Sequence, residues 1–132
     1  MNIKSSKELV DEANKVIKVM KPAQVKEALE KGEITLIDIR DIRELWKEGT
    51  IENSIHIPRG MLEFWLDPQS SYFKEKKIGQ IKNIVLFCAL GFRSALATKA
   101  LVDMGFNNVS NADGGFDALK NNGLKVITKE KK

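Results

Sequence analysis

The stretch Ile84-Val85-Leu86-Phe87-Cys88-Ala89-Leu90-Gly91-Phe92-Arg93-Ser94 decides how this chain folds and where its chemistry lies. Its first four residues form an apolar run that predicts a buried strand, and the residues after Arg93 repeat apolar side chains at helical spacing. Cys88, the only cysteine of the chain, would therefore end a strand just before a helix N-terminus. Parallel sheets bind ligands at this position, and helix amides stabilise an anion there. The pattern predicts a thiolate nucleophile; the alternative is a buried, inert structural cysteine.

Length and composition set broad limits on the rest of the chain. The 132 residues suit one domain, and a net charge of +4, from 22 basic and 18 acidic residues, suggests a surface of mixed sign. The basic residues are not interleaved with aromatic ones, so we expect no nucleic-acid partner. No apolar stretch has the length of a membrane span and the first residues lack a signal-peptide core, so we expect a cytoplasmic protein that binds no membrane.

Alternating strand and helix patterns predict an α/β fold with a parallel sheet covered on both faces. A capping box at Ser5 to Glu8 opens an N-terminal helix with Leu9, Ala13 and Val16 at helical spacing; this helix ends near Lys15 or Lys18, depending on whether residues 16–20 form a short strand. Residues 69–82 predict a loop with a turn near Gly79. We expect strands at 34–39, 54–57, 84–87 and 108–111, a last edge strand at 126–127, and helices over 22–32, 41–49, 93–104 and 116–120. A second capping box, Asp41-Ile42-Arg43-Glu44, opens the helix over 41–49.

The loop after Cys88 has the composition of an anion-binding turn. Gly91 allows the backbone to curl, so that successive N–H groups point inward toward the sulfur. The dipole of the following helix adds to this field, and together they should favour the thiolate. Arg93 can brace the loop or add positive charge, and Ser94 can cap the helix or bond the sulfur.

Several blocks in this order resemble the rhodanese family of sulfurtransferases. Cys88, Gly91 and Arg93 match the family's active-site loop, in which two residues separate Cys from Gly and one separates Gly from Arg. The other blocks are Leu36-Ile37-Asp38-Ile39-Arg40, Glu44-Leu45 through Ile57-Pro58, and Asp113-Gly114-Gly115-Phe116. The resemblance implies a three-layer fold with a central parallel sheet of about five strands and helices on both faces. We expect an N-terminal helical extension over residues 1–20 packed on the domain, a rhodanese domain over 21–128, and a basic tail over 129–132.

The chain departs from the family pattern at two positions. Thr50 stands where the family usually has His, and Phe116 stands where it has Trp. Both positions are usually structural in the family, so we expect altered packing rather than lost chemistry. The resemblance gives Asp38 and Arg40 a supporting role around the loop, and an ordinary strand-end ion pair or helix cap is the alternative for these two residues.

The length of the loop separates two chemistries that the resemblance leaves open. Four residues, Ala89 to Phe92, lie between Cys88 and Arg93, whereas related cysteine phosphatases and arsenate reductases have five. The shorter loop is similar to that of rhodaneses, which implies attack of Cys88 on a sulfane sulfur donor such as thiosulfate. The resulting persulfide would pass its sulfur to cyanide or a cellular thiol. We expect no cofactor and no metal. A non-catalytic interaction module and a small phosphatase or arsenate reductase are the alternatives.

The remaining candidates for the site lie between residues 56 and 65. His56, the only histidine, could form a dyad with Cys88, but a packed or partly exposed histidine is the favoured interpretation. Arg59 could attract an anionic donor, and Phe64 and Trp65 could wall a substrate pocket; packing on the core is the alternative for this segment. The sequence leaves monomer and homodimer equally open.

Overall fold

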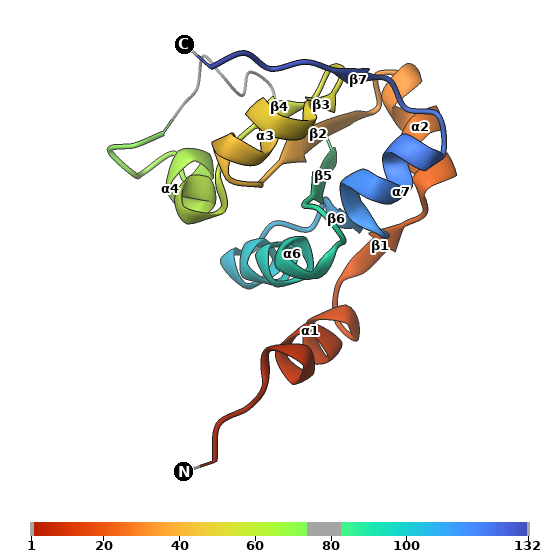
Figure 1. The fold of residues 1–132 in the computed structure, drawn as a ribbon. Coiled ribbons are helices and arrows are strands. Elements are labelled where there is room, and N and C mark those ends of the chain that lie inside the picture. Colours follow the sequence, from red (N-terminus) through yellow and green to blue (C-terminus); the bar gives the residue numbers. More distant parts are fainter. Residues whose placement is uncertain (1, 74–82, 132) are drawn as a thin grey trace.

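The computed structural model describes residues 2–73 and 83–131 and is built on a five-stranded parallel sheet, whose arrangement can be followed in Figure 1. The order β1-β6-β5-β2-β4 places β5 at the centre, and all neighbouring pairs are parallel. This confirms the predicted α/β class. The strands are β1 (Lys18–Met20), β2 (Ile34–Asp38), β4 (Ile55–His56), β5 (Asn83–Phe87) and β6 (Val109–Ala112).

Helices cover both faces of this sheet, as the alternating pattern predicts. One core packs between the sheet and α4 and α6, and the other lies between the sheet and α2 and α7. Along β5, Ile84 and Leu86 enter the first core, whereas Val85 and Phe87 enter the second. Cys88 continues this alternation and belongs to the α6 face. The helices are α1 (Ser6–Asn14), α2 (Pro22–Glu30), α3 (Ile42–Glu48), the 3-10 turn η1 (Arg59–Met61), α4 (Leu62–Leu66), α6 (Phe92–Met104) and α7 (Gly115–Asn121).

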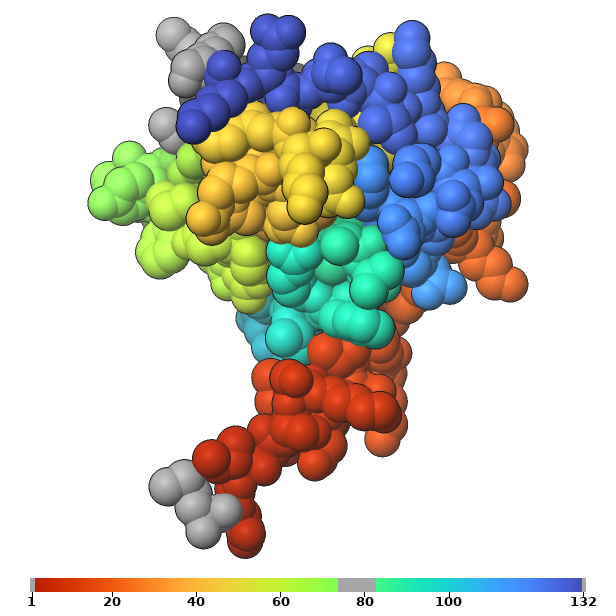
Figure 2. All heavy atoms as spheres, in the orientation of Figure 1, coloured from red at the N-terminus to blue at the C-terminus, as the bar shows by residue number. Residues whose placement is uncertain are grey.

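The N-terminal segment combines a helix and a strand. Ser5 caps α1 by accepting the Glu8 N–H at 3.0 Å, as predicted. The helix ends at Asn14 and residues 18–20 join the sheet as β1, which agrees with the shorter of the two predicted helix ends. Val10 and Ala13 are buried where α1 packs on α6, and α1 forms a lobe on one end of the molecule (Figure 2). The predicted apolar face was partly wrong: Leu9 is exposed on α1, and Val16 is exposed because it lies beyond the helix end.

Outside the main sheet, β3 (Thr50–Ile51) pairs antiparallel with β7 (Val126–Ile127). The expected edge strand at 126–127 is therefore present, but in a separate two-stranded sheet. The predicted turn near Gly79 lies outside the described residues. Among the helices of the described ranges, none combines the length and apolar character needed to cross a bilayer.

After the neighbouring strands β2 and β5, the chain continues toward opposite edges of the sheet. β2 leads through α3 to β4 on one side, and β5 leads through α6 to β6 on the other. Diverging connections open a crevice at the carboxyl ends of the two strands, which is where open α/β sheets bind ligands. Asp38 and Phe87 pair in register at this end, so Cys88 comes directly after the paired residues.

Candidate active site

The sulfur of Cys88 accepts hydrogen bonds from three donors of its own loop. The Gly91 N–H lies 3.2 Å from Sγ, the Ser94 N–H 3.4 Å and the Ser94 hydroxyl 3.3 Å. Cys88 itself is 1% exposed, and α6 begins at Phe92, so the sulfur sits at the N-terminal end of a 13-residue helix. Hydrogen bonds from amides and a helix N-terminus both favour a negative charge on sulfur. The predicted curled loop is thus present, and Ser94 bonds the sulfur.

Two glycines allow the loop to take this shape. Gly91 has a left-handed φ of +101°, which L-residues with a side chain rarely adopt. Gly115, at the start of α7, has φ +62°, and a Cβ there would lie 2.5 Å from the Cys88 carbonyl oxygen. The close approach lets the Phe116 N–H donate to that carbonyl at 2.7 Å and the Asp117 N–H to the Ala89 carbonyl at 3.3 Å. The first turn of α7 therefore holds the back of the Cys88 loop.

Arg93 points to an acidic partner on another element. Its two terminal nitrogens donate to the two carboxylate oxygens of Glu44 at 2.9 and 3.0 Å. These hydrogen bonds raise the pKa of Arg93 and lower the pKa of Glu44, against the opposing effect of burial on both groups. Glu44 also accepts the Asp41 N–H at 3.0 Å, which completes the predicted capping box of α3. Arg93 thus braces the loop by tying α6 to α3.

Asp38 and Arg40 form a fully buried ion pair beside the loop. Both side chains are 0% exposed, and Arg40 Nη2 lies 2.9 Å from Asp38 Oδ2. Thr50 donates its hydroxyl to the same Asp38 oxygen at 2.7 Å, and the Phe116 ring stacks 4.1 Å from the Arg40 guanidinium. The two residues that depart from the family pattern therefore both contact this ion pair. Through Phe116, the pair is linked to the α7 turn that holds the Cys88 carbonyl.

The other predicted site residues divide between packing and surface positions. The His56 ring nitrogen Nε2 lies 2.7 Å from the Arg40 carbonyl oxygen, which supports the packed interpretation rather than a dyad with Cys88. Arg59 forms an ion pair with Glu63 at 2.8 Å. Phe64 is 50% exposed and meets the Tyr72 ring edge to face, whereas Trp65 packs against the α6-side core. A pocket formed by Arg59, Phe64 and Trp65 stays a prediction.

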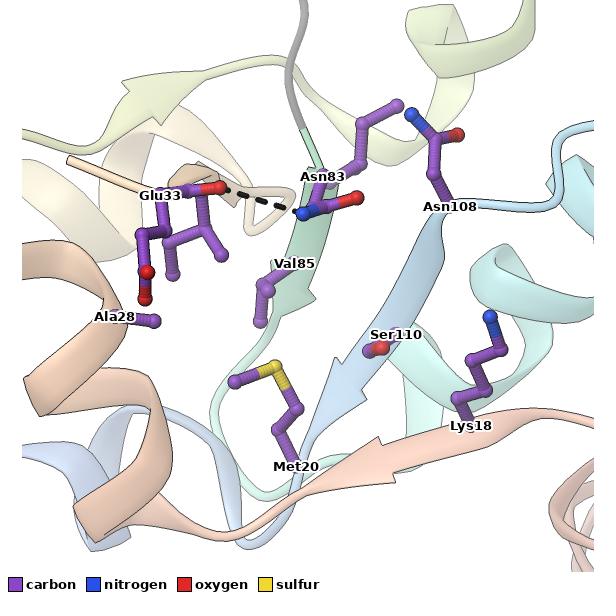
Figure 3. A pocket seen from close by; sticks show the side chains of 10 residues that line it. Lys18, Met20, Ala28, Glu33, Asn83, Val85, Asn108 and Ser110 are labelled. Carbon is purple, nitrogen blue, oxygen red and sulfur yellow. Dashed lines mark hydrogen bonds between the residues drawn. The ribbon is translucent and has the colours of Figure 1, made fainter. Parts of the chain in front are cut away.

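Two cavities differ in their relation to this loop. One of about 720 Å³ lies at the opposite, amino end of the sheet, where Met20, Val85 and Ser110 line it from β1, β5 and β6 (Figure 3). The other, of about 540 Å³, lies between α1 and the first turn of α6 and includes Phe92 and Arg93 in its lining. Only the second adjoins the Cys88 loop. Leu90 and Phe92 add exposed apolar side chains at this end of the molecule, at 52% and 61% exposure.

Sequence reasoning missed three contributions to the site. Glu44 was predicted only as a capping residue. Its ion pair with Arg93 left no signal in the sequence, because the two residues lie far apart along the chain. Asn111, expected only as part of a strand, donates its side-chain amide to the Gly91 carbonyl at 3.1 Å. Gly115 matched a family block, but its contact with Cys88 became visible only in three dimensions. Across residues 2–73 and 83–131, no cluster of His, Cys, Asp and Glu is arranged to hold a metal ion.

The site defines a class of α/β protein that presents one cysteine in an amide-lined loop at the end of a central strand. A family model described as Rhodanese-like domain matches residues 21–122. The chain belongs to the family of rhodanese-like domain proteins, as the resemblance predicted.

Relatives with known names agree with this assignment. The chain is 32% identical over 97 residues to a mouse protein named thiosulfate sulfurtransferase/rhodanese-like domain-containing protein 3, covering 70% of this chain and 62% of that protein. It is 34% identical over 86 residues to a putative mitochondrial thiosulfate sulfurtransferase of Schizosaccharomyces pombe, covering 61% and 59%. The chain thus spans about three fifths of the length of these two relatives.

Solved structures extend the likeness to the N-terminal segment. A protein of unknown function from Rhodopseudomonas palustris, described as a possible tyrosine phosphatase, is 39% identical with a TM-score of 0.88, covering 96% of this chain and 97% of that one. The polysulfide-sulfur transferase homodimer of Wolinella succinogenes is 34% identical with a TM-score of 0.72, covering 93% and 87%. These two descriptions apply to the Rhodopseudomonas and Wolinella proteins themselves and are not assigned to this chain.

Proposed function

We propose that this protein is a sulfurtransferase that carries sulfane sulfur as a persulfide on Cys88. The observation that carries the proposal is the set of three hydrogen-bond donors, from Gly91 and Ser94, that converge on Sγ. Donors arranged in this way stabilise negative charge on the attacking thiolate and on the persulfide that replaces it, without a side-chain base. The names of the mouse, yeast and Wolinella relatives support the same chemistry.

The proposed reaction has two covalent steps. The Cys88 thiolate attacks the outer sulfur of thiosulfate; the sulfur–sulfur bond of the donor breaks, its electron pair leaves with sulfite, and Cys88 becomes a persulfide anion. Cyanide or a thiol then attacks the outer persulfide sulfur and returns Cys88 to the thiolate. The cavity between α1 and α6 lies beside the loop and offers space for a donor or acceptor to approach. Arg59, Phe64 and Trp65 are proposed to contribute to binding, and a cytoplasmic location is proposed with them.

The test is a thiosulfate:cyanide assay on the purified chain, combined with mass spectrometry after exposure to a panel of sulfane donors. We expect thiocyanate production and one added sulfur atom on Cys88. Cys88→Ala should abolish both signals while leaving the fold intact, because Cβ is retained and only the sulfur is lost. The matched control is Ser110→Ala on the neighbouring β6. Absence of a persulfide on Cys88 with every donor in the panel would refute the proposal.

A phosphatase is the second candidate, because the Rhodopseudomonas palustris structure described as a possible tyrosine phosphatase is 39% identical over nearly the whole chain. The loop argues for sulfur chemistry instead, since only four residues separate Cys88 from Arg93 and a shorter loop makes a smaller cradle. Hydrolysis of p-nitrophenyl phosphate that depends on Cys88 would favour the phosphatase. If neither activity is found and cells carrying Cys88→Ala behave as the wild type, a non-catalytic interaction module is favoured.

A further inference from the structure

Asn111 links the central sheet to the loop that holds the Cys88 sulfur. It lies on β6, 4% exposed, and its side-chain amide Nδ2 donates to the Gly91 carbonyl at 3.1 Å. Gly91 in turn donates its N–H to Cys88 Sγ at 3.2 Å. One residue, Gly91, therefore stands between Asn111 and the sulfur.

The hydrogen bond fixes the orientation of a peptide plane at the mouth of the loop. The Gly91 carbonyl accepts from Asn111 and also from the Ala95 N–H at 3.2 Å, so two donors hold it. In a planar trans peptide the N–H of Phe92 points opposite to this carbonyl. As the first amide of α6, the Phe92 N–H has no partner within the helix. Asn111 therefore helps to fix the Gly91–Phe92 peptide, which lies between Gly91 and Ser94, the two residues whose amides donate to the sulfur.

The side-chain oxygen of Asn111, Oδ1, is unfavourably placed. Oδ1 is buried and has no hydrogen-bond partner among the described residues. Exchanging the amide nitrogen and oxygen would set an oxygen against the Gly91 carbonyl, so the orientation is settled by that contact. Burial of an unpaired oxygen weakens the core, and an apolar side chain of the same size would avoid it. The favourable contact that Asn111 makes is the one to the loop.

We propose that Asn111 is a positioning residue for the Cys88 loop, acting through the Gly91 carbonyl to hold the Gly91 and Ser94 amides on the sulfur. The reaction it serves is the sulfur transfer proposed above, and in that respect the inference rests on the proposed function. The part of the inference that concerns the rigidity of the Cys88 loop can be measured without any sulfur donor.

The experiment is the substitution Asn111→Leu in the full chain, with amide hydrogen exchange of Gly91 and Ser94 measured by NMR. Leu keeps the volume and removes the donor, and the Gly91 carbonyl keeps its bond from Ala95. We expect these two amides to exchange about fivefold faster, the effect of losing one typical hydrogen bond. The rate of Cys88 persulfide formation from thiosulfate should fall by a similar factor, while the melting temperature stays equal to or above that of the wild type.

The matched control is Val109→Ala, because Val109 lies two residues earlier on the same face of β6 and is buried away from the loop. It should lower the melting temperature without a selective effect on the Gly91 and Ser94 amides. If Asn111→Leu does not fold, Asn111→Ser serves, since its hydroxyl is too short to reach the Gly91 carbonyl. The inference would be overturned if the Gly91 and Ser94 amides exchange within twofold of the wild-type rate. It would also be overturned if they exchange faster while the rate of Cys88 persulfide formation is unchanged. Failure of the proposed function is recognised separately, by the absence of a persulfide on Cys88 of the wild-type chain with every donor in the panel.

Discussion

Ser94 supplies two of the three hydrogen-bond donors that reach the Cys88 sulfur. Its N–H belongs to the backbone of α6, but its hydroxyl, 3.3 Å from Sγ, is a side-chain contribution that can be removed alone. Ser94 is fully buried, so water cannot easily replace the lost donor. At the scale of single residues, the reactivity of Cys88 should therefore depend on this hydroxyl.

We expect Ser94→Ala to slow persulfide formation on Cys88 by about tenfold or more, because one hydrogen bond to a charged group is lost. Single-turnover kinetics with thiosulfate, followed by mass spectrometry, provide the measurement. Thr98→Val is the control: Thr98 is buried one turn further along α6, and its hydroxyl bonds the Ser94 carbonyl at 2.7 Å instead of the sulfur. Equal rates for Ser94→Ala and the wild type would show that the hydroxyl does not act on the sulfur.

At the scale of elements, the approach of α7 to the Cys88 loop depends on the absence of a side chain at Gly115. A Cβ there would meet the Cys88 carbonyl oxygen at 2.5 Å and the Ala89 carbonyl carbon at 2.7 Å. Both contacts involve backbone, which cannot rotate out of the way as a side chain can. A methyl group at this position must therefore displace α7 from the loop.

We expect Gly115→Ala to destabilise the protein strongly and to suppress persulfide formation in the fraction that remains folded. Gly105→Ala is a matched control, because Gly105 also has a left-handed φ, of +108°, but has open space around its Cβ position. The control should cost about 1–2 kcal/mol, the strain of the backbone conformation alone. Chemical unfolding of both variants measures the difference. A Gly115→Ala cost no larger than that of Gly105→Ala would contradict the steric argument.

At the scale of the whole molecule, the buried Asp38–Arg40 pair joins segments that are distant in the chain. Arg40 donates to the Gly49 carbonyl at 2.7 Å and stacks on Phe116, and Asp38 accepts from Thr50. The pair thus connects β2, the α3–β3 turn and α7. Removing one partner leaves the other charge buried without compensation.

We expect Arg40→Met to lower the free energy of unfolding by about 3–5 kcal/mol, the usual effect of breaking a buried pair. Glu48→Gln is the control, because Glu48 lies 3.5 Å from Arg40 Nη1 but is 48% exposed; its cost should stay below about 1 kcal/mol. Guanidinium unfolding of both variants provides the comparison. A loss for Arg40→Met as small as that for Glu48→Gln would show that the pair does not hold these elements together.

The sequence by itself determined the class of fold, the family and the position of the cysteine. The apolar run before Cys88 and the helical spacing after Arg93 are local patterns, and local patterns predict a strand followed by a helix wherever they occur. The capping boxes at Ser5 and Asp41 could be predicted from the sequence for the same reason, since their donors and acceptors lie within four residues of each other.

Only the tertiary structure decided which distant residues meet at the loop. Glu44 reaches Arg93, Asn111 reaches Gly91, and the first turn of α7 reaches the Cys88 carbonyl, all across separations that leave no periodic trace in the sequence. The same holds for β7, which was expected as an edge strand but pairs with β3 in a separate sheet. Such contacts depend on how the strands are ordered and on how closely the helices approach them. Nearby residues therefore predicted the Cys88 loop, and the packing of the whole chain determines what holds it in place.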